Sequence, residues 1–271
     1  MASMCGRFAV TTDPALLAEK IHALDEMTAI ATAAASGEKD ASGANYNVAP
    51  TTTISTVVKR HSEPDDESTR RLRAMRWGLI PAWAKTGSDG APEGKGPLLI
   101  NARAETVTTS PAFRSSAKGK RCLVPMDGWY EWRPNGELAS GKKAGKSAAK
   151  TPFYMYGGDG EPLFMAGLWS TWRPKDASKE TRPLLSCTII TTEAAAQLAH
   201  IHDRMPLTIS MADWDRWLDP DAPIDEGLLK GHGDLDRIEI REVSRLVNSV
   251  RNNGPELIEP AQPEPEQGVL L

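Results

Sequence analysis

The fold is decided by residues 121–133, which read RCLVPMDGWYEWR. The segments 121–126 and 129–133 are rich in apolar and aromatic residues, as β-strands are. Between them stands Asp127-Gly128, a pair that favours the tight turn of a β-hairpin. We therefore predict two strands joined directly by this turn.

Short strands are also predicted along the rest of the chain. They cover residues 6–10, 54–59, 72–79, 153–156, 163–168, 184–191, 207–209 and 238–243. Few helices interrupt them: one begins at Asp13-Pro14 and runs toward Met27, one covers 193–199, and one follows Ser210. Because the pattern does not alternate strand with helix, we expect an α+β fold: a single β-rich domain with a mostly antiparallel, barrel-like sheet flanked by helices.

Two insertions and a tail stand apart from this pattern. Residues 85–97 are rich in Gly, Pro and Lys, and residues 136–150 are of low complexity with four lysines, so both are expected to be exposed loops. Residues 259–271 are rich in Pro and Glu, and we expect a disordered acidic tail there.

Composition narrows the functional class. The 271 residues are 40% hydrophobic and 25% charged, which is typical of a soluble globular protein, and neither a secretory signal nor a membrane-spanning run is present. Three cysteines without a CxxC pair argue for a reducing, cytoplasmic setting and against zinc, and we expect no metal or cofactor. The net charge of −4 disappears when residues 255–271, which hold four glutamates and no Lys or Arg, are left out, so a local basic groove for nucleic acid is not excluded.

Cys5 is the first candidate for chemistry. If it became the N-terminal residue, its thiol and a free amine would lie on adjacent carbons, and this pair condenses with an aldehyde to a thiazolidine ring. The ordinary pKa values, about 7.7–8.0 for the amine and about 8.5 for the thiol, predict reactive forms of both near neutral pH. Position alone favours a small buried cysteine near a disordered start.

Glu131 and His202 are candidates for proton transfer. Glu131 is flanked by Trp129, Tyr130 and Trp132, so its pKa would be raised if it faced inward. The pattern leaves inward and outward orientations about equal. His202 precedes Asp203-Arg204 in a crowded polar segment; a lone histidine is more often a satisfied structural residue.

Two further pairs suggest ligand contacts. Asn101 and Arg103 share a face if this segment is extended. Asn101 would then position an oxygen, and Arg103 would hold a phosphate. Alternatively, the two residues cap the following helix and pair with Glu105. Trp77 and Trp83 flank a Gly- and Pro-containing segment and could stack on unpaired bases, although tryptophan is more often a core residue.

In this order, the combined motifs closely resemble the SRAP (SOS response-associated peptidase) family. The motifs are 4–8 (MCGRF), 46–50 (YNVAP), 76–83 (RWGLIPAW), 101–105 (NARAE), 127–132 (DGWYEW), 201–206 (IHDRMP) and 243–248. The resemblance implies one domain over residues 4–258. It also implies binding of single-stranded DNA and a covalent thiazolidine crosslink between the N-terminal cysteine and an abasic site, which shields the lesion.

The resemblance also assigns roles to individual residues. It implies a catalytic group made of Cys5, Asn101, Glu131 and His202. It implies DNA contacts from Arg7, Asn47, Pro50, Trp77, Arg103 and Arg204. It further implies Schiff-base (lyase-type) chemistry and thiol-dependent self-processing, in a monomer that is cytoplasmic and associated with the nucleoid.

Two features depart from the family pattern. Met1-Ala2-Ser3 precede Met4, so removal of the first methionine alone would leave the Cys5 nitrogen in an amide. Translation from Met4, residues added ahead of it, or self-cleavage would each resolve this, and we favour a start at Met4. In addition, Pro111 follows Ser110 where some members carry a basic residue, a contact that Arg114 could replace.

Two rival functions remain open. One is an N-terminal-nucleophile cysteine hydrolase such as a glutamine amidotransferase or a peptidase, because Met-Cys-Gly starts occur there too. The other is a non-catalytic module that binds single-stranded DNA while the nitrogen of Cys5 stays blocked.

Overall fold

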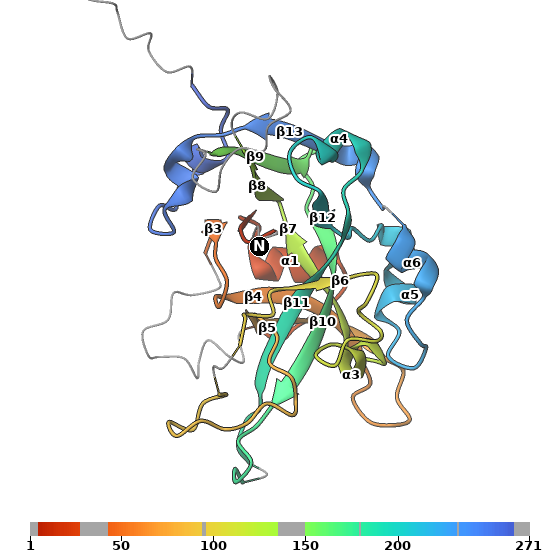
Figure 1. Ribbon diagram of the computed structural model, residues 1–271. Helices are drawn as coiled ribbons and strands as arrows, with labels where there is room; N and C mark the ends of the chain where they lie inside the picture. The colour runs from red at the N-terminus through yellow and green to blue at the C-terminus, as the bar shows by residue number, and fades with distance from the viewer. Residues whose placement is uncertain are drawn as a thin grey trace, which may run out of the picture.

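The computed structural model describes residues 5–27, 43–93, 96–134, 150–178, 180–231 and 233–262. Within these ranges two β-sheets pack against each other and short helices surround them, as Figure 1 shows. The expected α+β class, with one β-rich domain, is confirmed. Residues 136–149 of the predicted loop and residues 263–271 of the predicted tail lie outside the described residues, whereas Lys150 begins a strand.

The smaller sheet has five strands and is antiparallel throughout. In spatial order they are β13 (Ile238–Glu242), β9 (Lys150–Gly157), β8 (Gly128–Pro134), β1 (Phe8–Val10) and β3 (Asn45–Val48). The N-terminal strand β1 is therefore interior, between β8 and β3. This position fixes the residues just ahead of it against the middle of the sheet.

The larger sheet closes on itself. Its order is β12 (Arg204–Pro206), β11 (Leu184–Glu193), β10 (Leu163–Trp172), β7 (Arg121–Met126), β4 (Thr53–Arg60), β5 (Thr69–Trp77) and β2 (Leu24–Asp25). Strand β11 also pairs in parallel with β5 and with β6 (Asn101–Arg103). The β11–β5 pairing joins strands that the order otherwise separates, and it produces the barrel-like ring that was expected.

The predicted hairpin at Asp127-Gly128 is wrong. β7 pairs with β10 and β4, whereas β8 pairs with β9 and β1, so the chain passes from one sheet to the other at this point. The Asp127 carboxylate accepts hydrogen bonds from the backbone N–H and the hydroxyl of Thr11, and the backbone N–H of Asp127 donates to the Ala9 carbonyl. A Cβ at Gly128 would lie 2.3 Å from the Met155 carbonyl oxygen, so this glycine permits close strand approach rather than a hairpin turn.

The first helix, α1 (Pro14–Lys20), begins as predicted. The Asp13 carboxylate accepts from the N–H groups of Ala15 and Leu16, and Pro14 occupies the first turn. The helix ends before Met27 because His22 adopts a left-handed backbone, with φ of 52°. The remaining helical segments are short: α3 (Arg114–Ala117), α4 (Ala196–Ala199), η1 (Met211–Asp213), α5 (Trp214–Leu218), α6 (Glu226–Lys230), η2 (Leu235–Arg237), η3 (Arg245–Asn248) and η4 (Pro255–Leu257).

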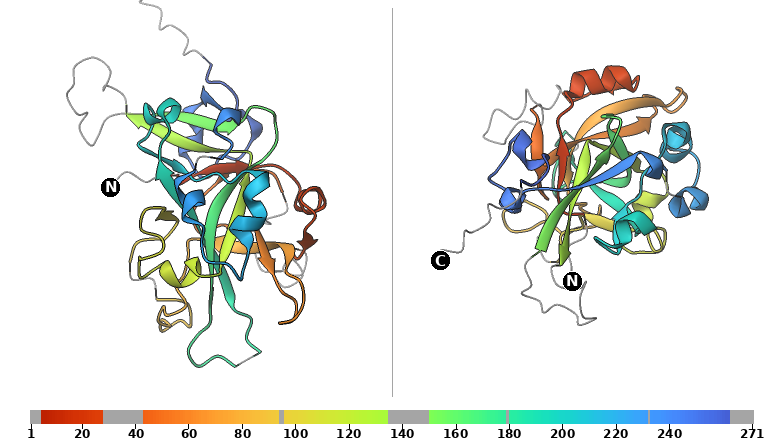
Figure 2. Two further views of the ribbon diagram at one scale, coloured as in Figure 1. Left: turned by 90° about the vertical axis from the view of Figure 1, so that its right-hand side faces the viewer. Right: turned by 90° about the horizontal axis from the view of Figure 1, so that it is seen from above.

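Two hydrophobic cores flank the larger sheet. One packs α1, α5 and α6 against its outer face and includes Leu72, Leu123 and Trp217. The other lies between the sheets and includes Cys5, Trp77 and Trp129. Seen from above in Figure 2, α1 and the α5–α6 pair lie outside the strands, which leaves the inter-sheet core enclosed by β-structure.

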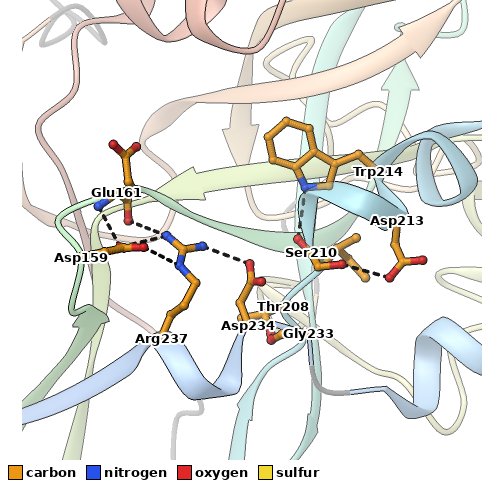
Figure 3. Close-up of polar contacts among 10 residues, drawn as sticks. Asp159, Glu161, Thr208, Ser210, Asp213, Trp214, Gly233, Asp234 and Arg237 are labelled. Carbon is orange, nitrogen blue, oxygen red and sulfur yellow. Dashed lines mark hydrogen bonds and ion pairs between the residues drawn. The ribbon is translucent and has the colours of Figure 1, made fainter.

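A polar network holds the β9–β10 turn against the segment before β13. In Figure 3 the Arg237 guanidinium lies between Asp159 and Asp234, and its Nε is 2.8 Å from the Asp159 carboxylate. The same guanidinium donates to the Glu161 carbonyl at 3.4 Å. Because β13 begins at Ile238, directly after Arg237, this network anchors the edge strand of the smaller sheet.

The start of the predicted tail is ordered rather than free. Pro260 forms a β-bridge with Val243, and the Ala261 N–H donates to the Glu242 carbonyl at 2.9 Å. The chain is thus paired to the end of β13 beyond the expected domain limit of 258. Among the described helices none has the length and apolar character needed to cross a lipid bilayer.

Candidate active site

The pairing of β1 with β8 brings Cys5 to Glu131. Phe8 lies opposite Trp129, and the Tyr130 N–H donates to the Arg7 carbonyl at 3.0 Å. Continuing this antiparallel register places the residues ahead of β1 beside Glu131. The Cys5 backbone nitrogen donates to Glu131 Oε1 at 2.6 Å.

Glu131 faces inward, which settles the orientation that the sequence pattern left open. Its side chain is 2% exposed, on the same side of β8 as Trp129, while Tyr130 packs in a separate cluster on the other side. Burial raises the pKa of Glu131 to about 8, an effect opposed by the Cys5 N–H and by Lys150 and reinforced by Asp203. A carboxyl group with this pKa exchanges protons near neutrality.

The Cys5 thiol is less acidic than expected from the sequence. Cys5 is 1% exposed, and this burial raises the pKa of the thiol well above its usual value. The charge of Glu131 adds a smaller increase. The prediction of a thiol that ionises near neutral pH is therefore wrong for this state of the chain. Thiol chemistry at this position would need a base close by.

The backbone at Cys5 is strained. Its φ is 24°, in the positive region that non-glycine residues rarely adopt. Asn101, at the start of β6, donates from Nδ2 to the Cys5 carbonyl oxygen at 3.3 Å. The two hydrogen bonds, from Cys5 to Glu131 and from Asn101 to Cys5, hold the residue on both sides of its α-carbon.

His202 lies in the connection between α4 and β12, and its side chain is 11% exposed. Its Nδ1 accepts from the Arg204 N–H at 3.0 Å, so the neutral ring carries its proton on Nε2. Burial lowers the pKa of His202, and the Asp203 carboxylate, 3.1 Å from Nδ1, opposes that shift. An ion pair with Asp203 forms only if the ring is protonated, because an accepting Nδ1 has no proton to donate.

His202 and Glu131 share the same electrostatic surroundings. Lys150 and Asp203 act on the pKa of both groups. Ile201, next to His202, packs in the inter-sheet core that contains Cys5. Asp203 is the sequence neighbour of His202, but sequence patterns gave no signal for Lys150 or for the effect of Asp203 on Glu131, because these depend on three-dimensional proximity.

Most of the predicted DNA-contacting polar residues hold the protein together. Arg7 donates to the Asn47 side chain at 2.7 Å and to the Val247 carbonyl at 2.9 Å. The Asn47 side chain also donates to the carbonyls of Val247, Ser249 and Asn252. These contacts tie β1 and β3 to the C-terminal segment.

Arg204 is also engaged within the protein. Its guanidinium contacts both carboxylate oxygens of Glu105, one of them at 3.0 Å, and donates to the Thr191 carbonyl at 2.6 Å. In contrast, Arg103 is exposed. Pro50 is half-buried in the turn between β3 and β4.

Trp77 does not offer a surface for base stacking. It is 0% exposed, its ring packs against Phe8, and its Nε1 donates to the Ile100 carbonyl at 3.0 Å. The prediction of a base contact through Trp77 is therefore wrong for this conformation, since its position on β5 directs it into the core. Trp83, six residues later in the loop, is 67% exposed.

Comparisons with known proteins agree with the fold and the motifs. The chain is 36% identical over 259 residues to the abasic site processing protein YoqW of Bacillus subtilis, covering 94% of this chain and 99% of that protein. It is 34% identical over 218 residues to the abasic site processing protein YedK of Escherichia coli (79% and 84% covered). It is 35% identical over 232 residues to the abasic site processing protein HMCES of Xenopus tropicalis (81% and 67% covered).

The fold is also seen in a solved structure. A crystal structure of a protein from Bacteroides thetaiotaomicron superposes with a TM-score of 0.70 at 22% identity, covering 95% of this chain and 100% of that one. The family model for SOS response associated peptidase (SRAP) matches residues 4–250. The chain therefore belongs to the SRAP family.

Proposed function

We propose that this protein processes abasic sites in single-stranded DNA by trapping the lesion covalently on Cys5. The observation that carries the proposal is the 2.6 Å contact between the Cys5 nitrogen and the buried carboxyl group of Glu131. It puts a proton carrier with a pKa of about 8 on the atom that must act as the nucleophile. The relatives named as abasic site processing proteins support the choice of substrate.

The amine must first be freed from its peptide bond with Met4. The Cys5 sulfur adds to the Met4 carbonyl carbon, and its proton passes through Glu131 to the Cys5 nitrogen as the C–N bond breaks. Water then hydrolyses the thioester, which releases the preceding residues as a carboxylic acid and restores the thiol. The positive φ of 24° at Cys5 favours this step, because the strain disappears once the peptide bond is cleaved.

The free amine then captures the lesion. The unprotonated amine adds to the aldehyde carbon of the open abasic sugar, and loss of water gives an imine. The thiol sulfur adds to the imine carbon while its proton goes to the nitrogen, and this closes the thiazolidine ring. One water molecule is lost overall, and Glu131 takes a proton from the ammonium and returns one to the departing hydroxyl.

His202 and Asn101 have complementary roles in this proposal. The Nε2–H of neutral His202 can donate to the ring oxygen of the sugar as the ring opens. Asn101 holds the Cys5 carbonyl and so limits rotation of the aminothiol. Trp83 and Arg103, both exposed, are the side chains available to stack on bases and contact phosphate.

The test uses single-stranded DNA with one abasic site and measures an adduct that survives denaturant. Three forms are compared: a chain processed to begin at Cys5, the same form with Cys5→Ala, and the full chain, whose intact mass is measured beforehand. An adduct only in the first, or in the full chain after it loses residues 1–4, supports the proposal. An adduct formed while residues 1–4 remain attached, or formed by Cys5→Ala, contradicts the aminothiol chemistry.

The same experiment separates the rival functions. A glutaminase or peptidase activity without a DNA adduct would favour the N-terminal-nucleophile hydrolase. Salt-sensitive DNA binding without an adduct would favour the non-catalytic binding module.

A further inference from the structure

A cavity of about 250 Å3 opens beside β3 and the start of β4, away from the catalytic side chains described above. Its wall includes Asn45 on β3, Thr52 and Thr53 at the entry to β4, and Val250 and Asn253 from the segment between η3 and η4. Val250 is 54% exposed at this surface. Together with residues 10–14, which also line it, the cavity is formed by three segments that are far apart in the sequence: 10–14, 43–55 and 250–253.

The chemistry of the wall suits an uncharged ring better than a phosphate. Every described residue lining the cavity is uncharged, so no cation is available there to neutralise a phosphate. Aliphatic surface comes from Val250, which is exposed, and from Val10, which is half-buried. Hydroxyl and amide groups supply the polar part, a combination of apolar walls and a few polar groups typical of small-ligand sites.

Two amide side chains present donors. Asn45 Oδ1 accepts from the Asn47 N–H at 2.9 Å, and Asn253 Oδ1 accepts from the Tyr46 N–H at 2.7 Å. Because the oxygens are used in this way, the –NH2 groups are the parts left to face a ligand; neither has a hydrogen-bond partner within the described ranges. A ligand with carbonyl or ring-nitrogen acceptors matches this arrangement.

The wall is also held rigidly in an unusual conformation. Thr51 has a φ of 74°, which a β-branched residue rarely adopts. Two backbone hydrogen bonds to buried Trp77 hold this turn: Thr51 N–H to the Trp77 carbonyl at 2.8 Å, and Trp77 N–H to the Thr52 carbonyl at 2.9 Å. Backbone strain that the surroundings maintain occurs preferentially at ligand sites.

The cavity is close enough to Cys5 for one DNA strand to reach both. Cys5 is three positions before Phe8, and three residues of extended chain span at most about 10 Å. Phe8 is paired with Val48 at the cavity, and paired strand residues lie about 5 Å apart. The cavity wall is therefore within about 15 Å of Cys5, a distance that a few nucleotides of single-stranded DNA cover.

We propose that this cavity holds one unpaired nucleobase of the bound strand, a few nucleotides from the lesion. Recognition is by the amide donors of Asn45 and Asn253 and the hydroxyl of Thr52, with the aliphatic wall beneath the ring. The inference rests on the proposed function, because it takes single-stranded DNA as the ligand. It adds a site that reads a base where the catalytic group reads only a sugar.

The test measures affinity for strands that cannot be crosslinked, with a tetrahydrofuran analogue in place of the abasic sugar. In a series of such strands, a second base is removed at each successive position on either side of the lesion. We expect one position at which removal of the base lowers affinity roughly tenfold, and less than about twofold effects at the others. Asn45→Asp keeps an oxygen that accepts from the Asn47 N–H but replaces the –NH2 donor with a second oxygen. In this variant, removal of the base at that position should lower affinity by less than about threefold.

Controls separate this site from general effects. Thr52→Val removes a hydroxyl with little change of shape and should also reduce the positional penalty, whereas Thr109→Val, outside the cavity, should not. The melting temperature of each variant establishes that it is folded. If Asn45→Asp does not fold, Thr52→Val alone provides the test of the cavity. A penalty that is spread evenly over positions, or unchanged in both cavity variants, overturns the nucleobase site while leaving adduct formation intact. Failure of the wild type to bind any strand overturns the proposed function as well.

Discussion

Glu131 Oε1 lies 2.6 Å from the backbone nitrogen of Cys5, although the two residues are 126 positions apart in the sequence. The contact joins the central strand of the smaller sheet to the segment that leads into β1. A buried carboxyl group therefore accepts a hydrogen bond from the nitrogen that, in the proposed chemistry, becomes the nucleophile.

Glu131→Gln should slow adduct formation by roughly 10²- to 10⁴-fold, the usual contribution of a positioned acid or base. Glutamine retains an oxygen that can accept from the Cys5 nitrogen, so the local geometry should persist while proton transfer is lost. Adduct yield is followed over time on denaturing gels, with affinity for a tetrahydrofuran strand as the control. A rate within threefold of wild type would mean that Glu131 only shapes the site.

The stability of the full chain should fall as pH rises. Burial raises the pKa of folded Glu131 to about 8, so the folded state binds this proton more tightly than the unfolded state does. The stabilisation is complete below the unfolded pKa of about 4.3 and is lost as pH rises through 8. Urea unfolding at pH 5 and pH 9 should show a loss of roughly 2–5 kcal/mol that Glu131→Gln removes. Equal pH dependence in the variant would contradict the raised pKa.

His202→Asn should separate the structural and chemical roles of this side chain. The asparagine oxygen can replace Nδ1 as acceptor of the Arg204 N–H, but no group replaces the Nε2–H. We expect a melting temperature near that of wild type and crosslinking or its reversal slowed by about 10²-fold or more. His202→Ala, which loses both groups, should lower stability in addition. Full activity in His202→Asn would assign the histidine a purely structural role.

Glu105→Gln should increase the salt dependence of DNA binding. Arg204 lowers the pKa of Glu105, so the carboxylate is charged at neutral pH and neutralises the guanidinium. Without that charge, Arg204 becomes available to a phosphate, and the slope of log K against log salt should steepen by about 0.7 for one added contact with single-stranded DNA. An unchanged slope would show that Arg204 acts only within the protein, through Thr191 and Glu105.

Trp83→Ala should weaken binding of single-stranded DNA by roughly 5- to 150-fold, the equivalent of about 1–3 kcal/mol for one stacked base. Trp77→Phe provides the matched comparison, because Trp77 is buried. That variant should lower the free energy of unfolding by about 1–3 kcal/mol and leave DNA affinity nearly unchanged. The reverse pattern would restore Trp77 as the base-contacting residue.

Local signals in the sequence were sufficient where the responsible interactions are local. Asp13 and Pro14 start α1 because the cap and the first turn involve adjacent residues. The same reasoning failed at Asp127-Gly128, where the choice between a hairpin and a passage between sheets depends on Met155, Tyr154 and Thr11. None of these partners is close enough in sequence for a turn motif to report it.

By itself, the sequence determined the α+β class, the starts of α1, β10 and β11, and the family, because these follow from local patterns and from motifs in the chain. Tertiary structure alone decided that Glu131 faces inward, that Trp77 is buried while Trp83 is exposed, and that Arg7, Asn47 and Arg204 are engaged in internal contacts. The physical reason is that burial and hydrogen-bond partners are properties of pairs of residues brought together by strand register. A sequence specifies that register only through the whole fold.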